Sequence, residues 1–288
     1  ATGVRVIDRN TKVGTTYSAR IIFLNASTIG TAQILLGSAN EKNPNGLANG
    51  SDQVGRNLMD HMYALATIGV LPDGPNTFSK GRRPTGIYIP RYRNVTEPAE
   101  GYVRGYGYQG GLTRVGGRPG AGDAGIGAEL KERAREFGPW MIFISGFGEM
   151  LPNPDNRVTL HPSRKDAWGM PIPHIECALG DNEAQMARQI LADGKAMVEA
   201  AGGKVLNQAS EPGTPGLGIH EMGTARMGRD PRTSVLNGFN QAHEVPNLFI
   251  TDGAAMSSSG CQNPSLTYMA LSARAADHAV KLLKEGQL

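Results

Sequence analysis

Two strand-to-helix segments, one near each end of the chain, most constrain the fold. Residues 19–27, ARIIFLNAS, form a nearly continuous apolar run of the kind found in buried strands, and residues 28–40 follow with helical spacing. Residues 245–253, VPNLFITDG, form a second apolar strand, and a helix is expected to run from Pro264 to about Glu285. Because a strand followed by a helix is the unit of partly parallel sheets, we expect an α/β fold at both ends of the chain.

The middle of the chain has a different pattern. Turns rich in glycine, asparagine and proline alternate with short strands, which we expect at residues 85–93, 101–111, 139–150 and 156–162. A short charged helix is expected at 125–137. A longer amphipathic helix is expected at 181–201, with Asp181 as its N-cap and an apolar face formed by Met186, Ile190, Met197 and Val198.

These patterns predict an α/β protein, α+β overall, in which one sheet domain is interrupted by a second domain. Residues 1–62 and 216–288 supply the α/β domain, and residues 63–215 supply the inserted domain, an antiparallel sheet with helices. The length of 288 residues is sufficient for two such domains.

Composition excludes several classes of partner. The 29 basic and 26 acidic residues are spread along the chain without a basic cluster, which argues against nucleic acid and membrane surfaces. No apolar run reaches the roughly 18 residues of a membrane span. Two cysteines do not make a disulfide framework or a metal site; two thiols are favoured, and a single bridge stays open. The chain opens on a strand already under way, without a signal peptide, so we interpret it as a fragment of a soluble protein and leave the compartment, cytoplasm or periplasm, open.

Two motifs carry side chains suited to chemistry. In GIHEMGTARMG, residues 218–228, two residues separate His220 from a Gly-Thr pair, a form that no zinc site, nucleophile elbow or phosphate loop has. In the second motif, a buried strand ends at Asp252-Gly253, small residues follow, and Asn263-Pro264 open a helix. The unpaired N–H groups at a helix start suit an anionic ligand. The alternative from local pattern alone is an ordinary strand–loop–helix connection with Asn263 as N-cap.

The two motifs resemble a known family. HEMGTARMG, followed by SVLNGFNQAHEVPNLFITDGAAMSSSGCQNPSLTYMALSARAADH, looks like the C-terminal signature of the glucose–methanol–choline (GMC) flavoprotein oxidoreductases, closest to their pyranose-oxidase-like and bacterial glycoside-oxidising branch. GLANGSDQVGRNLMDHM and GEMLPNPDNRVTLHPSRKDAWGMPIPHI resemble further family segments. The resemblance implies that the α/β domain is an incomplete, FAD-binding, Rossmann-like domain and that the inserted domain binds substrate.

The resemblance also implies roles for individual residues. His220 matches the family's active-site histidine and Asn263 its partner, so the expected reaction oxidises a secondary alcohol of a sugar or glycoside, with hydride passing to flavin N5. An imidazole, with a reference pKa of about 6.5, suits the proton-accepting step, and Asn263 would position the hydroxyl. Further residues are expected to contact FAD: Asp252, Gly253 and Ala254 near the ribityl and pyrophosphate, and Asn263, Pro264, Ser265 and Thr267 at the flavin.

Other polar residues receive weaker interpretations. Gln109 is either a sugar ligand or a cross-strand structural amide, and the loop at 116–125 is either a substrate lid or a plain glycine-rich loop. His61 is expected to be structural near a domain junction, and Arg226 to anchor its own turn through a carboxylate. The remaining histidines are interpreted as packing or surface residues: His161, His174, His243 and His278.

One departure from the family has consequences. The G-x-G-x-x-G strand–turn–helix that holds the ADP half of FAD is absent from this sequence. We therefore expect a separate N-terminal FAD-binding segment or subunit as partner, and expect the lone chain to bind FAD poorly and to be inactive. Alternatives are a non-catalytic C-terminal module for assembly, or an enzyme for an aliphatic or choline-like alcohol, although choline would require an aromatic cage and only 6% of residues are aromatic. The electron acceptor, oxidase or dehydrogenase activity and an oligomer stay open.

Overall fold

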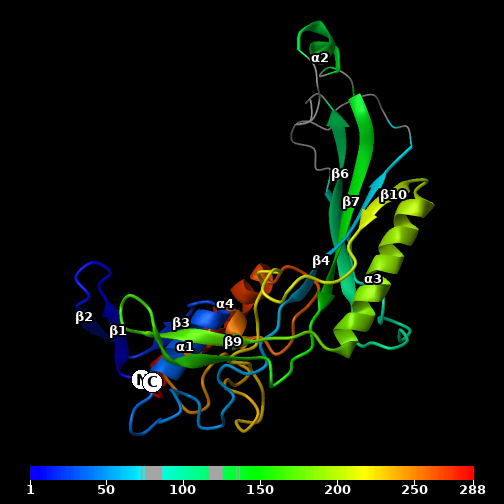
Figure 1. Ribbon diagram of the computed structural model, residues 1–288. Coiled ribbons are helices and arrows are strands. Elements are labelled where there is room, and N and C mark those ends of the chain that lie inside the picture. The colour runs from blue at the N-terminus through cyan, green and yellow to red at the C-terminus, as the bar shows by residue number, and fades with distance from the viewer. Residues whose placement is uncertain (73, 75–85, 117–125, 134, 136) are drawn as a thin grey trace. The chain divides into compact units, whose positions relative to one another are not determined.

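The computed structural model of the chain describes residues 1–72, 74, 86–116, 126–133, 135 and 137–288 (Figure 1). These residues form two compact units. The first unit comprises Ala1–His61, Met150–Leu179 and Gly218–Leu288, and the second comprises Met62–Glu149 and Gly180–Leu217. Each unit therefore joins segments that are far apart in the sequence.

The first unit contains a parallel strand pair with a helix after each strand. β3 (Ile22–Leu24) pairs in parallel with β11 (Leu248–Ile250), so that Phe23 lies opposite Phe249. Helix α1 (Thr28–Gly37) follows β3, and the short 3₁₀-helix η1 (Gly253–Ala255) and helix α4 (Ser265–Lys284) follow β11. The expectation of an α/β fold is confirmed here at the level of a mixed α/β architecture.

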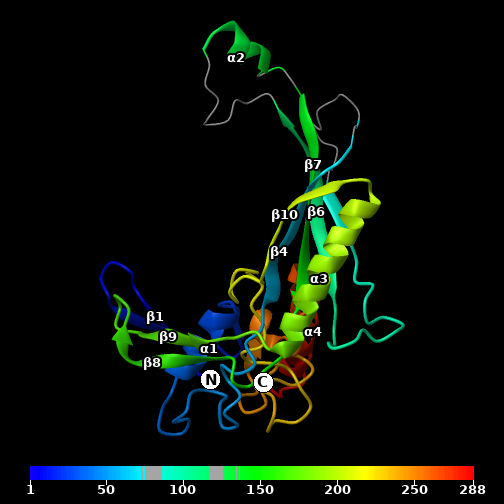
Figure 2. The ribbon, with the colours of Figure 1, turned by 45° about the vertical axis from the view of Figure 1, so that its right-hand side comes forward.

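Two antiparallel hairpins complete the first unit. β1 (Gly3–Ile7) pairs with β2 (Gly14–Ser18), and β8 (Arg157–Lys165) pairs with β9 (Pro171–Glu176). The second hairpin contacts α1 through both of its strands, and Figures 1 and 2 both show α1 beside it. These contacts explain why residues 150–179, which we expected in the inserted domain at 63–215, pack in the first unit with the two ends of the chain.

The core of the first unit depends on small residues that allow α4 to approach the parallel strands. Phe249 is fully buried and packs against Ala275 and Ala279 of α4. On the neighbouring strand Phe23 stacks on Phe249, with ring centroids 5.1 Å apart. A separate apolar cluster joins α1, η1, β11 and the loops that contain Val54 and Leu236. Its members include Leu35, Val54, Leu236, Ile250 and Ala254.

The second unit is a five-stranded sheet with a long helix on it. The strands are β4 (His61–Val70), β5 (Gly86–Ile89), β6 (Tyr106–Gly116), β7 (Phe137–Glu149) and β10 (Lys204–Gln208), in the order β10-β4-β7-β6-β5. The β10–β4, β6–β7 and β5–β6 pairs are antiparallel. Helix α3 (Asp181–Ala200) lies along the sheet in Figure 2, and the short helix α2 (Ala128–Arg133) precedes β7.

Glycines in β7 allow α3 to pack closely on the sheet. A Cβ at Gly146 would lie 2.2 Å from Ile190 Cγ2, and one at Gly148 would lie 3.1 Å from Met186 Sδ. Met186 and Ile190 are fully buried. The apolar face expected for this helix is therefore the face that is buried, and it includes Val198 as well.

Element boundaries differ from the sequence-based ranges in several places. Gly180, and not Asp181, is the N-cap of α3, because the Glu183 side chain accepts a hydrogen bond from the Gly180 N–H and starts the helix one residue earlier. Pro264, and not Asn263, is the N-cap of α4. The helix expected at 125–137 is limited to Ala128–Arg133 among the described residues. The proposed lid at 116–125 lies, apart from Gly116, outside the described residues.

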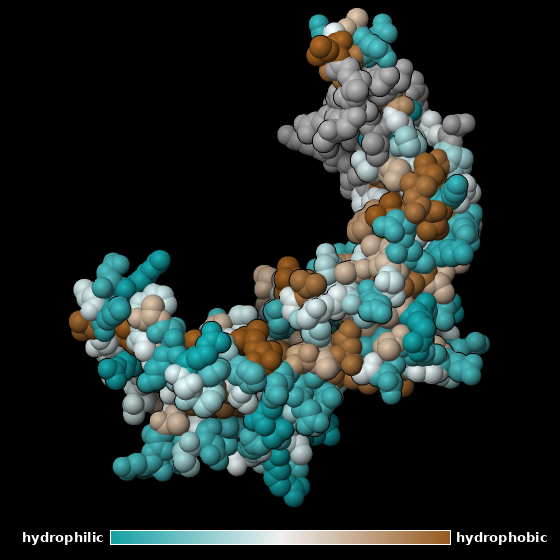
Figure 3. Space-filling view, in the orientation of Figure 1, coloured by the Kyte–Doolittle hydropathy of each residue, from teal (hydrophilic) through white to brown (hydrophobic). Residues whose placement is uncertain are grey.

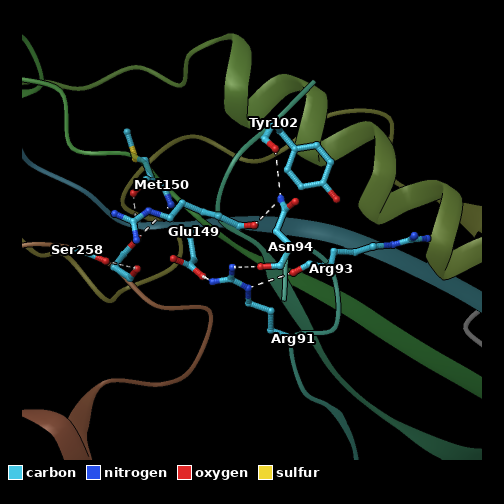
Figure 4. A network of polar contacts seen from close by, with 9 residues as sticks. Arg91, Arg93, Asn94, Tyr102, Glu149, Met150 and Ser258 are labelled. Carbon is cyan, nitrogen blue, oxygen red and sulfur yellow. Dashed lines mark hydrogen bonds and ion pairs between the residues drawn. The ribbon is translucent and has the colours of Figure 1, made fainter. Parts of the chain in front are cut away.

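A network of polar side chains joins the second unit's sheet, its helix and the loop at 91–104. The Asp193 carboxylate accepts hydrogen bonds from Tyr92 and Tyr106 Oη, both 2.6 Å, and from Arg93 at 2.7 and 2.9 Å. Burial opposes ionisation of Asp193, but these donors together hold its pKa below the usual range. Figure 4 shows the adjoining contacts, in which Arg91 Nη1 donates to Glu149 at 2.8 Å. The network ties the loop to both the sheet and α3.

Candidate functional site

The Gly-Thr motif (Gly223-Thr224) lies against the Asp-Gly motif (Asp252-Gly253) in the first unit. The N–H groups of Gly223, Ala225 and Met227 donate to the carbonyl oxygens of Gly253, Ala254 and Ala255, at 3.1, 2.9 and 2.9 Å respectively. Residues 223–227 thus run along the whole length of η1. Because these bonds use backbone groups, they fix the spacing of the two motifs independently of side chains.

The start of α1 joins these two segments. Thr224 Oγ1 donates to the carbonyl of Thr28 at 2.7 Å, and Thr28 Oγ1 donates to the carbonyl of Glu221 at 2.5 Å. A Cβ at Gly253 would lie 2.4 Å from the Glu221 carbonyl oxygen and 2.6 Å from Thr28 Oγ1. Only glycine fits at this crossing, which explains why a glycine follows Asp252 in the Asp-Gly motif.

Asp252 organises the loop that follows β11. Its Oδ1 accepts the Ala254 N–H at 2.9 Å and so caps η1, and its Oδ2 accepts Thr31 Oγ1 at 2.5 Å. Burial raises the pKa of Asp252, and the hydrogen bonds from Thr31 and Ala254 oppose that rise. Both carboxylate oxygens are therefore engaged by protein donors from the two ends of the chain.

His220 lies on a turn that is bound to the segment before β4. The Gly218 and His220 N–H groups donate to Asp60 Oδ2 and Oδ1 at 2.9 and 3.2 Å. Met59 and Met222 exchange two backbone hydrogen bonds, each 2.9 Å long. The backbone around His220 is thus anchored by the Asp60 carboxylate at residues 218 and 220 and by Met59 at residue 222.

His61 packs directly on His220. Their ring centroids are 4.9 Å apart with planes at 89°, an edge-to-face arrangement, and His61 is 2% exposed. Burial and, secondly, the charge of His220 lower the pKa of His61 to about 4; Asp60 and the Gly260 backbone oppose that shift. His61 is therefore neutral at neutral pH and lies beside both His220 and the loop that leads to Asn263.

The N-terminus of α4 is exposed and presents backbone donors. Asn263, Ser265 and Thr267 are exposed, while Pro264 is buried. The first backbone bond of the helix is from the Tyr268 N–H to the Pro264 carbonyl at 3.0 Å. Among the described residues the N–H groups of Ser265 and Thr267 have no acceptor, as expected for the first turn of a helix. This end of α4 can accept an electron-rich ligand.

The structure thus gathers most of the sequence-derived candidates in the first unit: His220, Asp252, Gly253, Ala254, Asn263, Pro264, Ser265 and Thr267. Gln109 belongs to the second unit, on β6 opposite Ser145 and Tyr88. Arg226 anchors its turn through the Thr233 carbonyl, at 3.1 Å, where a carboxylate partner was expected. Sequence reasoning did not identify Asp60 or Thr28, since a single polar residue in a loop carries no local signal.

Three features of the structure bear on other kinds of site. Cys177 and Cys261 form no disulfide, which agrees with the favoured interpretation. Within the described ranges, no group of three or more metal-binding side chains occurs. Of the helices that the structure describes, none is long and apolar enough to cross a membrane.

Comparison with solved structures supports the fold. Formate oxidase from Aspergillus oryzae matches 99% of this chain and 58% of its own, with a TM-score of 0.66 at 13% identity. Pyridoxine 4-oxidase from Mesorbium loti matches 96% of this chain and 54% of its own, with a TM-score of 0.54 at 17% identity. At these identities the likeness concerns the fold alone.

Sequence comparison identifies the family. The profile described as GMC oxidoreductase matches residues 152–272. The 2-methyl-1,2-propanediol dehydrogenase of Mycolicibacterium austroafricanum is 34% identical over 96% of this chain and 51% of its own length. The fructose dehydrogenase large subunit of Gluconobacter japonicus is 34% identical over 93% of this chain and 48% of its own length. The chain spans about half the length of these relatives. The resemblance expected from the motifs is confirmed at the level of the family: the chain belongs to the GMC oxidoreductase family, whose homologues are FAD-dependent enzymes acting on CH–OH groups.

Proposed function

We propose that this chain forms the alcohol-activating part of an FAD-dependent oxidoreductase that converts a secondary alcohol of a sugar or glycoside into a ketone. The observation that carries the proposal is the shared neighbour of the two candidate catalytic residues. His61 contacts the ring of His220, and the backbone of Gly260, three residues before Asn263, opposes the lowering of the pKa of His61. His220 and Asn263 thus belong to one compact unit, and the turn that carries His220 and the loop that leads to Asn263 both pass His61.

His220 is the base in this proposal. Its Nδ1 is buried and has no hydrogen-bond partner among the described residues, whereas the residue as a whole is partly exposed. The substrate hydroxyl can therefore meet only Nε2, which takes the hydroxyl proton. When bound, FAD supplies the acceptor for the hydride that leaves the alcohol carbon.

Asn263 positions the substrate in this proposal. A carboxamide both donates and accepts hydrogen bonds, so it can hold the hydroxyl while His220 takes the proton. Its exposure before the first turn of α4 leaves the side chain accessible to a ligand. Holding two reacting groups in place in this way can supply several kcal/mol of the barrier reduction.

The residues present fit FAD. The acceptor-free N–H groups of Ser265 and Thr267 suit the electron-rich edge of a flavin ring. Tyr268 Oη is buried without a hydrogen-bond partner among the described residues and lies 2.9 Å from the Cβ position of Gly253. Together with Asp252 and Ala254, these residues would hold the isoalloxazine and ribityl portions.

We propose further that an N-terminal FAD-binding segment or subunit completes the site. The sequence has no G-x-G-x-x-G turn between a strand and a helix. Large apolar side chains are exposed on the first unit, including Phe23 at 41%, Leu266 at 77% and Met269 at 68%, and Figure 3 shows hydrophobic patches among hydrophilic ones on the face in view. Such patches are typical of surfaces that a partner covers.

The experiment that tests the proposal measures flavin reduction in the full-length protein that contains this chain. His220→Gln should lower the rate constant for flavin reduction by about 10²- to 10⁴-fold, because the proton acceptor is lost. His174→Gln is the matched control, since His174 is exposed on β9. A change of less than about threefold in His220→Gln would contradict the proposal and favour a non-catalytic module for assembly.

A second measurement addresses the partner. The lone 288-residue chain is titrated with FAD and compared with the full-length protein. We expect weak binding by the lone chain because it lacks the dinucleotide-binding turn. Tight, stoichiometric binding would show that no N-terminal segment is required.

An aliphatic diol is the second candidate substrate, because one relative at 34% identity is named for 2-methyl-1,2-propanediol. The other at 34% is named for fructose. A panel of pyranosides, ketohexoses and 1,2-diols, compared by kcat/KM in the same protein, separates the two classes. A preference for the diols would replace the sugar substrate while leaving the roles of His220 and Asn263 intact.

A further inference from the structure

The turn that carries His220 is strained. Ile219 has a φ of 55°, in the left-handed region that β-branched residues rarely adopt, and its side chain is 76% exposed. An exposed isoleucine gains little packing to offset such a conformation. Strained backbone of this kind persists only where surrounding contacts over-determine it.

Asp60 supplies those contacts. It is 2% exposed, and its two carboxylate oxygens accept the N–H groups on both sides of Ile219, from Gly218 at 2.9 Å and from His220 at 3.2 Å. A Cβ at Gly218 would lie 2.5 Å from Asp60 Oδ1, so glycine is required for this approach. One buried charge thus holds both ends of the strained residue.

The ring of His220 needs separate support. A histidine that acts as a base is commonly oriented by a hydrogen bond at its second nitrogen, but Nδ1 of His220 is buried and has no such partner among the described residues. The edge-to-face contact with the buried His61 ring, at 4.9 Å between centroids, provides orientation through packing. His61 follows Asp60 directly, and its N–H donates to Asp60 Oδ1 at 2.7 Å.

We propose that Asp60 and His61 form a positioning pair for His220, in which Asp60 holds the strained backbone of the turn and His61 fixes the angle of the imidazole ring. This inference rests on the proposed function of His220 as the base. His61 is itself too buried to meet a substrate, so it acts through His220 and not on the reacting atoms.

The first test compares shape with chemistry at position 61 in the full-length, FAD-loaded protein. His61→Ala removes the ring, and the rate constant for flavin reduction at saturating substrate should fall by about 10- to 100-fold. His61→Phe keeps an aromatic ring of similar width, so its loss should be less than about threefold. The substrate dissociation constant should stay within about threefold in both, since neither variant removes a substrate contact. Equal losses in the two variants would overturn the packing role.

The second test addresses the strained turn. Asp60→Asn should lower the same rate constant by about 10-fold or more, because one charged acceptor is lost. Adding Ile219→Gly, which removes the Cβ from the left-handed position, should recover most of that loss. If the double variant is as slow as Asp60→Asn alone, the turn is not held against strain and the role of Asp60 is overturned.

A third readout does not depend on activity. Histidines labelled at Cε1 in the full-length protein without FAD are assigned by His→Gln variants, and the His220 resonance is followed by NMR. It should move in His61→Ala and Asp60→Asn and stay unchanged in His174→Gln. An unmoved resonance in both positioning variants overturns the pair. If His220→Gln leaves flavin reduction unchanged, the proposed function fails, whereas this resonance still decides whether the pair positions the ring.

Discussion

Replacing Gly253 by alanine tests how closely the segments of the candidate site approach one another. A Cβ at this position would lie 2.4 Å from the Glu221 carbonyl oxygen, 2.6 Å from Thr28 Oγ1 and 2.9 Å from Tyr268 Oη. All three distances are below 3.0 Å, which real Cβ contacts essentially never show. At least one neighbouring segment must therefore move.

The size of the effect follows from what has to move. The nearest atom is a backbone carbonyl that already accepts a hydrogen bond from Thr28, so it cannot turn aside as the end of a flexible side chain could. Overpacking of this kind costs about 1–3 kcal/mol, and the backbone obstacle places Gly253→Ala in the upper part of that range. A loss of about 2–3 kcal/mol should lower the urea midpoint by about 1–1.5 M, for a slope of about 2 kcal/mol per M.

The assay is urea unfolding of the full-length protein, followed by far-ultraviolet circular dichroism. Gly238→Ala is the matched control, because a Cβ there meets nothing within 4 Å; it should be neutral or slightly stabilising. Glu221 precedes the Gly-Thr motif and follows His220, so Gly253→Ala should also slow flavin reduction in the folded protein. If Gly253→Ala and Gly238→Ala unfold at the same urea concentration, the close crossing of the three segments is refuted.

Three further predictions concern stability. Burial and His220 lower the pKa of His61 to about 4, whereas an unfolded histidine titrates near 6.5. The contribution of His61 to the free energy of unfolding should therefore be constant above pH ~6.5 and should fall by about 3 kcal/mol between pH ~6.5 and ~4. Urea midpoints measured against pH should show this fall in wild type and not in His61→Phe, and parallel curves for the two proteins would contradict it. Asp193→Asn should lower the free energy of unfolding by about 2 kcal/mol, since Arg93, Tyr92 and Tyr106 lose a charged acceptor; an unchanged thermal midpoint would show that the network contributes nothing. Phe249→Ala should destabilise by about 3–5 kcal/mol through the cavity it leaves, whereas Phe143→Ala, 45% exposed, should change stability by less than about 1 kcal/mol in the same urea titration.

The fold could be predicted where its signal is local. The apolar runs before α1 and α4 and the periodicity of α3 depend on residues within one or two turns, and each of these elements is present. The placement of residues 150–179 could not be predicted in this way. The alternation in β8 and β9 suits any sheet, and what assigns the hairpin to the first unit is its contact with α1, more than a hundred residues away in the sequence.

The candidate site shows the same division more sharply. His220 and Asn263 stand in motifs, but Asp60 and His61 are joined to His220 by contacts across about 160 residues of sequence, for which no local pattern exists. Ile219 is the extreme case, because local preference argues against a left-handed isoleucine and only the two N–H groups held by Asp60 account for it. Local rules fail where tertiary contacts determine geometry, which is expected of functional positions. That this failure falls on the residue immediately before His220 is therefore an independent reason to assign the turn a role beyond packing.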